Sequence, residues 1–249
     1  MPEKMIDVNG ASLWIAETGS GRPLLLLPGG VGIGDYLGSF TGQIDSMATV
    51  YRVEPRGCGR STRDGRYDLN TTLGDLDAIR EELGHERWIV AGHSHGAFYS
   101  LAYALKHPER VDAIIHMAGT GLQSDRSWSA AYHAGVDAGL GKEAPENLFG
   151  EVNMEAHRQG NDSYKEYVRR PGLWRDVANL DVPMLAVYGE RDIRPMWPVE
   201  QIVSLMPNAR LEVIPNAPHD FWYTHPGELS VILRRFLAVL DRVDEIASS

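Results

Sequence analysis

The sequence has little cysteine: Cys58 is the only one among 249 residues. A single cysteine excludes an internal disulfide, which fits a reducing compartment and predicts a cytoplasmic protein. Apolar runs are also short, and none approaches the roughly 18 residues that a membrane-spanning helix needs. Residues 1–10 have neither the basic start nor the apolar stretch of a signal peptide. We therefore expect no membrane partner.

Positive charge is scarce as well. The chain has 24 Lys and Arg against 34 Asp and Glu, a formal net charge of −10. Nucleic-acid binding depends on a basic surface, so we expect no nucleic-acid partner and favour a small-molecule substrate. The contents of 43% hydrophobic and 23% charged residues are typical of folded proteins and argue against disorder. The composition leaves both a monomer and a homodimer open.

Short apolar runs alternate with amphipathic stretches along the chain, which is typical of an α/β protein with a mostly parallel sheet flanked by helices. The runs predict strands over 22–27, 49–54, 88–91, 111–117, 184–188 and 211–214. Apolar residues at helical spacing predict helices over 69–83, 97–106 and 226–243.

One region, residues 121–182, has no strand-like run and is rich in Ala, Glu, His and Trp. A long crossover connection is one interpretation, but loops beyond about 15 residues are rarely without structure. We favour a small helical cap inserted between two consecutive strands. The predicted division is a core of residues 1–121 and 177–249 and a cap of residues 122–176.

The strongest chemical signal is the G-x-S-x-G pattern at 92–96, read as GHSHG, between a predicted strand and a predicted helix. A sharp turn of this kind exposes the central hydroxyl at a helix N-terminus, where the helix dipole stabilises developing negative charge. An ordinary glycine-rich turn is the simpler interpretation, but the strand and helix on either side favour Ser94 as a nucleophile.

A nucleophilic serine needs a base and an acid to orient that base. His219 follows the last predicted strand and precedes the last predicted helix, which favours it over His225 and His107 as the base. Asp192 follows the strand at 184–188; it could instead cap a turn, and Glu190 is a nearby competitor. The order serine, aspartate, histidine is the order expected of an α/β hydrolase.

Four segments together carry a resemblance to the α/β-hydrolase superfamily: LPGGVG at 27–32, RGCGRS at 56–61, GHSHG at 92–96, and the loops of Asp192 and His219. The first two are most similar to the proline iminopeptidase group, although Glu54 and Pro55 stand where that group has Asp-Gln. The resemblance implies the α/β-hydrolase fold with a small helical cap, and a catalytic triad of Ser94, Asp192 and His219.

The oxyanion of an acyl-transfer reaction needs two N–H donors. In this fold one donor is the amide after the nucleophile, here His95, and the other comes from the loop after an early strand, here Gly30. Aromatic and apolar residues near these loops predict a substrate pocket, whose expected lining is Val31, Phe98, Trp128, Trp197 and Trp222. His93 and His95 form an H-x-H pair, but no third ligand follows at metal spacing, so we expect no metal and no cofactor.

These observations predict a serine hydrolase of a small carboxylic ester, lactone or amide. A proline iminopeptidase-like aminopeptidase is the first alternative, in which acidic residues of the cap bind a free amine; the candidates are Glu143, Glu146, Glu151 and Glu155. A ligand receptor or a lyase on the same fold is the second alternative.

Overall fold

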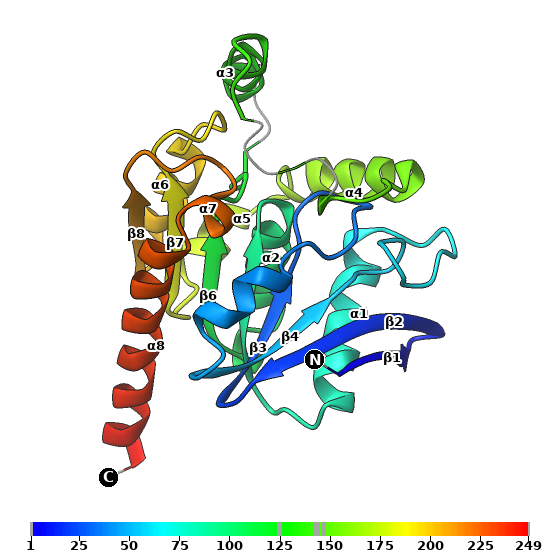
Figure 1. Cartoon of the computed structure of the whole chain (residues 1–249), viewed down its shortest axis with the longest axis vertical. Coiled ribbons are helices and arrows are strands. Elements are labelled where there is room, and N and C mark those ends of the chain that lie inside the picture. Colours follow the sequence, from blue (N-terminus) through cyan, green and yellow to red (C-terminus); the bar gives the residue numbers. More distant parts are fainter. Residues whose placement is uncertain (1, 124–125, 142–144, 146–147, 249) are drawn as a thin grey trace.

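A computed structural model of the chain describes residues 2–123, 126–141, 145 and 148–248. One sheet has the strand order β1-β2-β4-β3-β5-β6-β7-β8 (Figure 1). Strand β2 pairs antiparallel with β1 and β4, and all other pairs are parallel, which confirms the predicted mostly parallel sheet. The strands are β1 (Glu3–Val8), β2 (Ala11–Gly19), β3 (Arg22–Leu27), β4 (Ala48–Val53), β5 (Trp88–His93), β6 (Val111–Met117), β7 (Met184–Gly189) and β8 (Ala209–Ile214).

The two N-terminal strands form a hairpin that the apolar runs did not indicate. Asn9 and Gly10 make its turn with φ of 49° and 74°. Both values lie in the left-handed region that a two-residue hairpin turn requires, and Asn-Gly supplies it at low cost. Val8 and Ala11 pair directly across this turn, which fixes the register of the hairpin.

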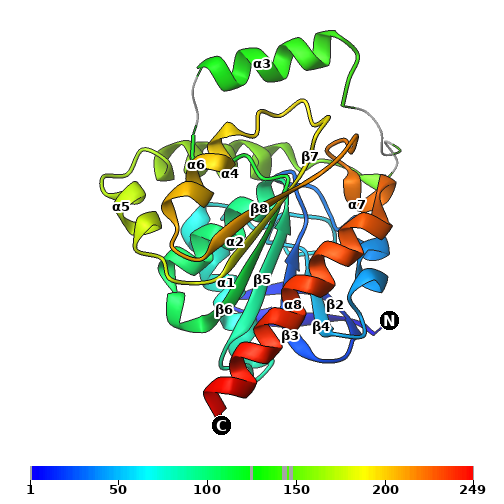
Figure 2. The ribbon, with the colours of Figure 1, turned by 90° about the vertical axis from the view of Figure 1, so that its left-hand side faces the viewer.

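Helices cover both faces of the sheet and bury it (Figure 2). One face packs against α1 (Leu69–Glu82), α2 (His95–Lys106) and α6 (Trp197–Leu205), and the other against the 3-10 helix η1 (Gly38–Gln43), α7 (Phe221–Thr224) and α8 (Pro226–Ser248). A further 3-10 helix, η2 (Pro108–Arg110), precedes β6. Every residue of β5 is buried, with alternate side chains in the two layers, which explains its continuous apolar run.

The segment between β6 and β7 contains α3 (Arg126–Asp137), α4 (Met154–Tyr167) and α5 (Leu173–Ala178), and no strand among its described residues. Helix α4 is fixed to the core: Asn153 donates its backbone N–H to Gly32 O at 2.9 Å and its side chain to Gly57 O at 3.0 Å. Helix α3 has no buried residue. Figures 1 and 2 show it beyond the carboxyl ends of the parallel strands. The division into core and cap at the stated boundaries stays a prediction. Helix α5 ends at Ala178, two residues beyond the predicted end of the cap at residue 176.

The predicted strands and helices agree closely with the structure. Strands over 22–27 and 111–117 have the predicted bounds, and the other strands differ by at most two residues at either end. Helix α2 begins at His95, two residues before the predicted start, and α8 extends to Ser248. No helix in the described part of the chain combines the length and apolar composition that crossing a bilayer requires.

Candidate active site

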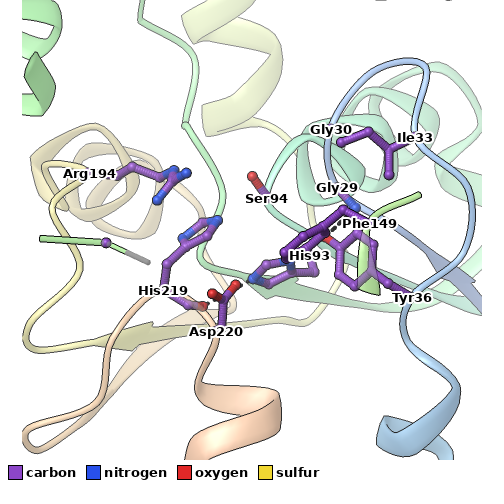
Figure 3. A pocket seen from close by; sticks show the side chains of 11 residues that line it. Gly29, Gly30, Ile33, Tyr36, His93, Ser94, Phe149, Arg194, His219 and Asp220 are labelled. Carbon is purple, nitrogen blue, oxygen red and sulfur yellow. Dashed lines mark hydrogen bonds between the residues drawn. The ribbon is translucent and has the colours of Figure 1, made fainter. Parts of the chain in front are cut away.

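Ser94 lies between the end of β5 and the start of α2 with φ of 55° and ψ of −118°. Such a backbone conformation costs about 1–3 kcal/mol for a residue other than glycine. The flanking glycines make the turn possible: a Cβ on Gly92 would lie 2.2 Å from the Gly96 carbonyl carbon, and one on Gly96 would lie 2.4 Å from Leu27 O. The strained turn places the Ser94 side chain at the carboxyl edge of the sheet, facing a cavity (Figure 3).

His219 and Asp192 come from the loops that follow β8 and β7, two neighbouring strands. The distance between His219 Nδ1 and Asp192 Oδ2 is 2.6 Å, and the two side chains are only 7% and 1% exposed. Because a carboxylate only accepts hydrogen bonds, Nδ1 carries the proton in this pair, and Nε2 is the nitrogen available for proton transfer.

The carboxyl group of Asp192 is held in its charged form. Burial raises its pKa, but the charge and hydrogen bond of His219, followed by those of Arg194, outweigh burial and lower the pKa below the ordinary value of 3.8. Asp192 is therefore ionised at neutral pH and can both orient His219 and stabilise its protonated ring.

Ser94 and His219 line one cavity of about 220 Å³ (Figure 3). Asp192 does not line it and reaches it only through its hydrogen bond to His219. The described structure contains no hydrogen bond between Ser94 Oγ and the His219 ring; catalytic hydrogen bonds are commonly long before substrate binds. The other residues that line the cavity are Gly29, Gly30, Ile33, Tyr36, His93, Gly141, Phe149, Arg194 and Asp220.

A chain of buried hydrogen bonds connects the three loops around this cavity. The Gly29 N–H donates to Tyr36 Oη at 2.7 Å, and Tyr36 Oη lies 2.6 Å from His93 Nδ1. Because the hydroxyl accepts from Gly29, its own proton is directed to His93 Nδ1. His93 Nε2 then donates to the His219 carbonyl oxygen at 3.1 Å. Tyr36 and His93 thus fix the glycine loop and the histidine loop relative to Ser94.

We predict that Tyr36→Phe lowers the free energy of unfolding by about 1–3 kcal/mol, because removal of the hydroxyl leaves the buried Gly29 N–H and His93 Nδ1 without their partner. Urea denaturation of the wild type and the variant measures the change. Tyr223→Phe is the matched control, since the Tyr223 side chain is 47% exposed. An equal effect of the two substitutions would contradict the proposed bridging role of Tyr36.

The two predicted oxyanion donors lie beside Ser94, and their role stays a prediction. His95 is the first residue of α2, where helix N–H groups have no partner inside the helix. Gly30 lines the cavity with φ of 70°, and a Cβ there would lie 2.3 Å from the Ile33 side chain. The Gly29 N–H is bonded to Tyr36, which leaves Gly30 as the predicted donor of the glycine loop.

Three buried histidines, His93, His95 and His116, favour their neutral form. Burial lowers the pKa of His95 to about 3 and that of His116 to about 4. Burial, with the nearby His219 ring second, holds the pKa of His93 well below its usual range. Below pH 6.5 the unfolded chain binds protons that the folded protein does not bind, so stability is lost as the pH falls toward 4.

We therefore predict that the free energy of unfolding decreases from pH 6.5 to pH 4, by up to about 1.4 kcal/mol per pH unit for each of these histidines. Urea denaturation at pH 7.5, 6, 5 and 4.5 gives the slope. His116→Leu is expected to make the slope shallower by about one proton, and His133→Gln, at an exposed residue of α3, serves as the control. A slope that His116→Leu leaves unchanged would refute this assignment.

The predicted lining of the substrate pocket needs correction, because none of its five residues lines the Ser94 cavity. Val31 packs against α4, where a Cβ on Gly160 would lie 2.4 Å from it. Phe98 packs edge-on against Tyr164, and Trp222 is 1% exposed beside Tyr36. Trp128 stacks on Tyr132 of α3, and Trp197 lines a separate surface groove. These side chains stabilise the packing of the core and cap or lie apart from the site.

Sequence reasoning missed Tyr36, Ile33, Arg194 and Asp220 as lining residues. Of these four, Tyr36 could have been predicted most easily. It lies in the loop after β3, and β3 is the neighbour of β5, the strand that leads to Ser94. His93, considered from the sequence as part of an H-x-H pair, also lines the cavity.

A metal centre receives little support from the geometry. Possible ligand atoms of His93, His219 and Asp220 lie within 4.8 Å of one another. Both ring nitrogens of His93, however, are already bonded to Tyr36 Oη and the His219 carbonyl. The other two residues alone are fewer than the three protein ligands of an ordinary catalytic zinc site.

Comparison with known proteins agrees with the geometry. The profile of the family described as alpha/beta hydrolase fold matches residues 22–138. A putative proline iminopeptidase of Mycoplasma genitalium is 33% identical over 132 residues, covering 52% of this chain and 41% of that protein. The proline iminopeptidase of Neisseria meningitidis is 38% identical over 101 residues, covering 38% of this chain and 32% of that protein. The chain thus spans about two-fifths or less of these curated relatives in the matched regions.

The solved structures resemble the chain over nearly its whole length. An esterase from Exiguobacterium antarcticum superposes with a TM-score of 0.77 at 19% identity, covering 94% of this chain and 99% of that one. The sheet order, the strained serine turn and the positions of Asp192 and His219 define an α/β-hydrolase fold. The chain thus has the α/β-hydrolase fold, its residues 22–138 match the alpha/beta hydrolase family model, and it is similar in part to proteins named proline iminopeptidase.

Proposed function

We propose that this chain is a serine hydrolase that cleaves a small carboxylic ester, or a lactone or amide, through an acyl-enzyme. One observation carries the proposal: the strained Ser94 and His219 line the same small cavity, and His219 is hydrogen-bonded to the buried Asp192. The cavity of about 220 Å³ favours a compact substrate.

The proposed reaction has two steps. In the first, Ser94 Oγ forms a bond to the substrate carbonyl carbon, His219 Nε2 takes the hydroxyl proton and passes it to the leaving atom, and the bond to that atom breaks. In the second, water attacks the acyl carbon, its proton returns through His219 to Ser94, and the Ser94 ester bond breaks. The amides of Gly30 and His95 hold the oxyanion in both steps.

An aminopeptidase is the second candidate, favoured by the names of the curated relatives. It requires an anionic group for the free amine of the substrate. Glu143 and Glu146 lie outside the described residues. Glu151 and Glu155 are exposed and do not line the Ser94 cavity; Glu151 lines a different cavity beside Asp35, and Glu155 accepts from Gln159. Of the four predicted glutamates, the two that the structure describes thus lie away from the Ser94 cavity, and the carboxylate that lines it is Asp220.

Cys58 has no part in the proposed chemistry. Burial raises the pKa of its thiol to about 12, so the reactive thiolate is scarce at neutral pH. The proposal includes the cytoplasmic location expected from this lone cysteine.

Labelling with a fluorophosphonate, followed by kinetics on phenyl acetate and proline β-naphthylamide, tests the proposal. We expect one label per chain, on Ser94, and many turnovers of the ester. Faster turnover of the naphthylamide would establish the aminopeptidase instead. A labelled protein without turnover of either substrate would favour a receptor or a lyase, and a protein that neither labels nor turns over would refute the hydrolase assignment.

A further inference from the structure

Arg194 brings a positive charge to the catalytic cavity. It lies two residues after Asp192 and lines the same cavity as Ser94 and His219. Figure 3 shows Arg194 and His219 on one side of this cavity and Gly30 and Ile33 on the opposite side. The guanidinium therefore lies on the side of His219, the proposed proton carrier, and across the cavity from Gly30, one of the two proposed oxyanion donors.

Two contacts hold the Arg194 guanidinium within the described part of the chain. Its Nη1 lies 3.4 Å from Asp192 Oδ1, near the limit of a hydrogen bond, and its guanidinium lies 5.3 Å from the centre of the Tyr132 ring. Asp192 is already engaged, since Oδ2 bonds His219 and Oδ1 accepts the Arg194 backbone N–H at 2.9 Å.

A guanidinium has five N–H donors in a planar fork that fits a carboxylate. The Arg194 side chain is only 20% exposed. Its ionic partner among the described residues, Asp192 at 3.4 Å, is shared with His219, so an anion in the cavity would give the guanidinium a second and closer partner. The small volume of the cavity places such an anion close to the reacting bond.

Resting on the proposed acyl transfer, we infer that Arg194 determines specificity by binding a carboxylate on the leaving-group half of the substrate. In that reaction His219 delivers its proton to the leaving atom, so the leaving group lies on the His219 side of the cavity, where Arg194 also lies. The substrate class is then a compact ester, lactone or amide that releases a hydroxy acid or an amino acid.

Arg194 could instead be a purely structural residue that holds Asp192 and Tyr132 in place. The two roles differ in a measurable way. Loss of a structural contact changes the rates for charged and neutral substrates equally, whereas loss of a carboxylate site changes their ratio.

The test compares kcat/KM for 4-acetoxybenzoate with that for 4-acetoxybenzamide, which has the same acyl group and an uncharged leaving group. We expect the wild type to prefer the carboxylate on the order of 10- to 100-fold, as a charge-assisted hydrogen bond predicts. Arg194→Gln should bring the ratio close to one, mainly through KM, and Arg194→Lys should keep part of it. Arg191→Gln is the matched control, because Arg191 is exposed and does not line the cavity; it should keep the wild-type ratio.

A second pair of esters tests on which half of the substrate the carboxylate is bound. Monophenyl succinate has a carboxylate on its acyl half, and phenyl butyrate has an uncharged acyl half. A preference for the succinate ester as large as that for 4-acetoxybenzoate would overturn the leaving-group assignment. A ratio for the acetoxy pair that Arg194→Gln leaves unchanged would overturn the role of Arg194.

A binding measurement separates this inference from the proposed function. Calorimetry on the Ser94→Ala protein compares 4-hydroxybenzoate with 4-hydroxybenzamide, and needs no turnover. Tighter binding of the carboxylate, lost when Arg194→Gln is added, supports the site even if no ester is hydrolysed. Equal binding of the two compounds, or binding of neither, overturns it even if the chain proves to be an esterase.

Discussion

Ser94→Ala is expected to reduce kcat for a small aryl ester by at least about 10⁴-fold, since serine hydrolases lose catalysis on this scale when the nucleophile is removed. The variant forms no acyl-enzyme, because no hydroxyl remains for His219 to deprotonate. Folding should be unaffected, since Ser94 Oγ makes no hydrogen bond within the described structure and alanine meets the same backbone strain at φ of 55°. Steady-state kinetics and fluorophosphonate labelling measure the loss.

Ser100→Ala is the matched control for this variant. Ser100 lies in the second turn of α2, buried, with its hydroxyl donating to Gly96 O at 3.0 Å. The substitution removes a hydroxyl of the same kind from the same helix, but not from the cavity, and should keep kcat within about threefold while lowering stability by about 1 kcal/mol. A Ser94→Ala protein that keeps ordinary turnover would show that the nucleophile lies elsewhere.

The parallel part of the sheet was predictable because its strands are buried on both faces. Such strands are continuous apolar runs, as in residues 24–27 and 88–91, and they stand out from the amphipathic helices between them. Strand β1 has no such run, because the side chains of residues 3–5 are exposed, and the one buried run of the hairpin, residues 13–16 of β2, was overlooked. The hairpin's signal was the Asn9-Gly10 turn, which depends on backbone conformation and not on hydropathy.

The placement of Ser94, Asp192 and His219 was predictable for a topological reason. Each follows a strand of the parallel sheet, and the carboxyl ends of parallel strands meet at one edge. Chain order and strand position therefore suffice to bring the three residues close together. Their catalytic roles are the proposal that Ser94→Ala and Asp192→Asn test.

The lining of the cavity was not predictable in the same way, because it depends on side-chain direction within loops. Trp222 follows His219 by three residues yet points into the core, where it packs on Tyr36. Arg194, in a loop that also contains Glu190 and Arg191, is the member whose side chain faces the cavity. Aromatic composition indicated a pocket, but burial of apolar area in the core and cap accounts for most of those rings.

Asp192→Asn is expected to lower kcat by about 10³- to 10⁴-fold, with a small change in KM. The amide that replaces the carboxylate carries no negative charge, so it accepts the His219 Nδ1–H more weakly. Its NH₂ group can instead donate to Nδ1, which favours the His219 tautomer with the proton on Nε2. His219 then presents Nε2–H to Ser94 and cannot take the serine proton. Steady-state kinetics between pH 6 and 9 measures the effect, and a raised pH should recover some rate as hydroxide replaces the general base.

Glu190→Gln distinguishes this role from a general loss of negative charge in the loop. Glu190 is exposed, and its Oε2 accepts the Asn216 N–H at 2.8 Å, so it has no contact with His219 in the described structure. Burial raises the pKa of Asp192, but His219 and Arg194 outweigh burial and lower the pKa below its ordinary value. The Asp192 carboxylate therefore also stabilises the folded protein at neutral pH. That contribution is lost as the pH falls through the acid range and the carboxylate is protonated. We therefore expect Asp192→Asn, and not Glu190→Gln, to lower the free energy of unfolding at pH 7. The difference in this free energy between Asp192→Asn and the wild type should become smaller near pH 3. A loss of turnover as large in Glu190→Gln as in Asp192→Asn would reassign the acid of the triad.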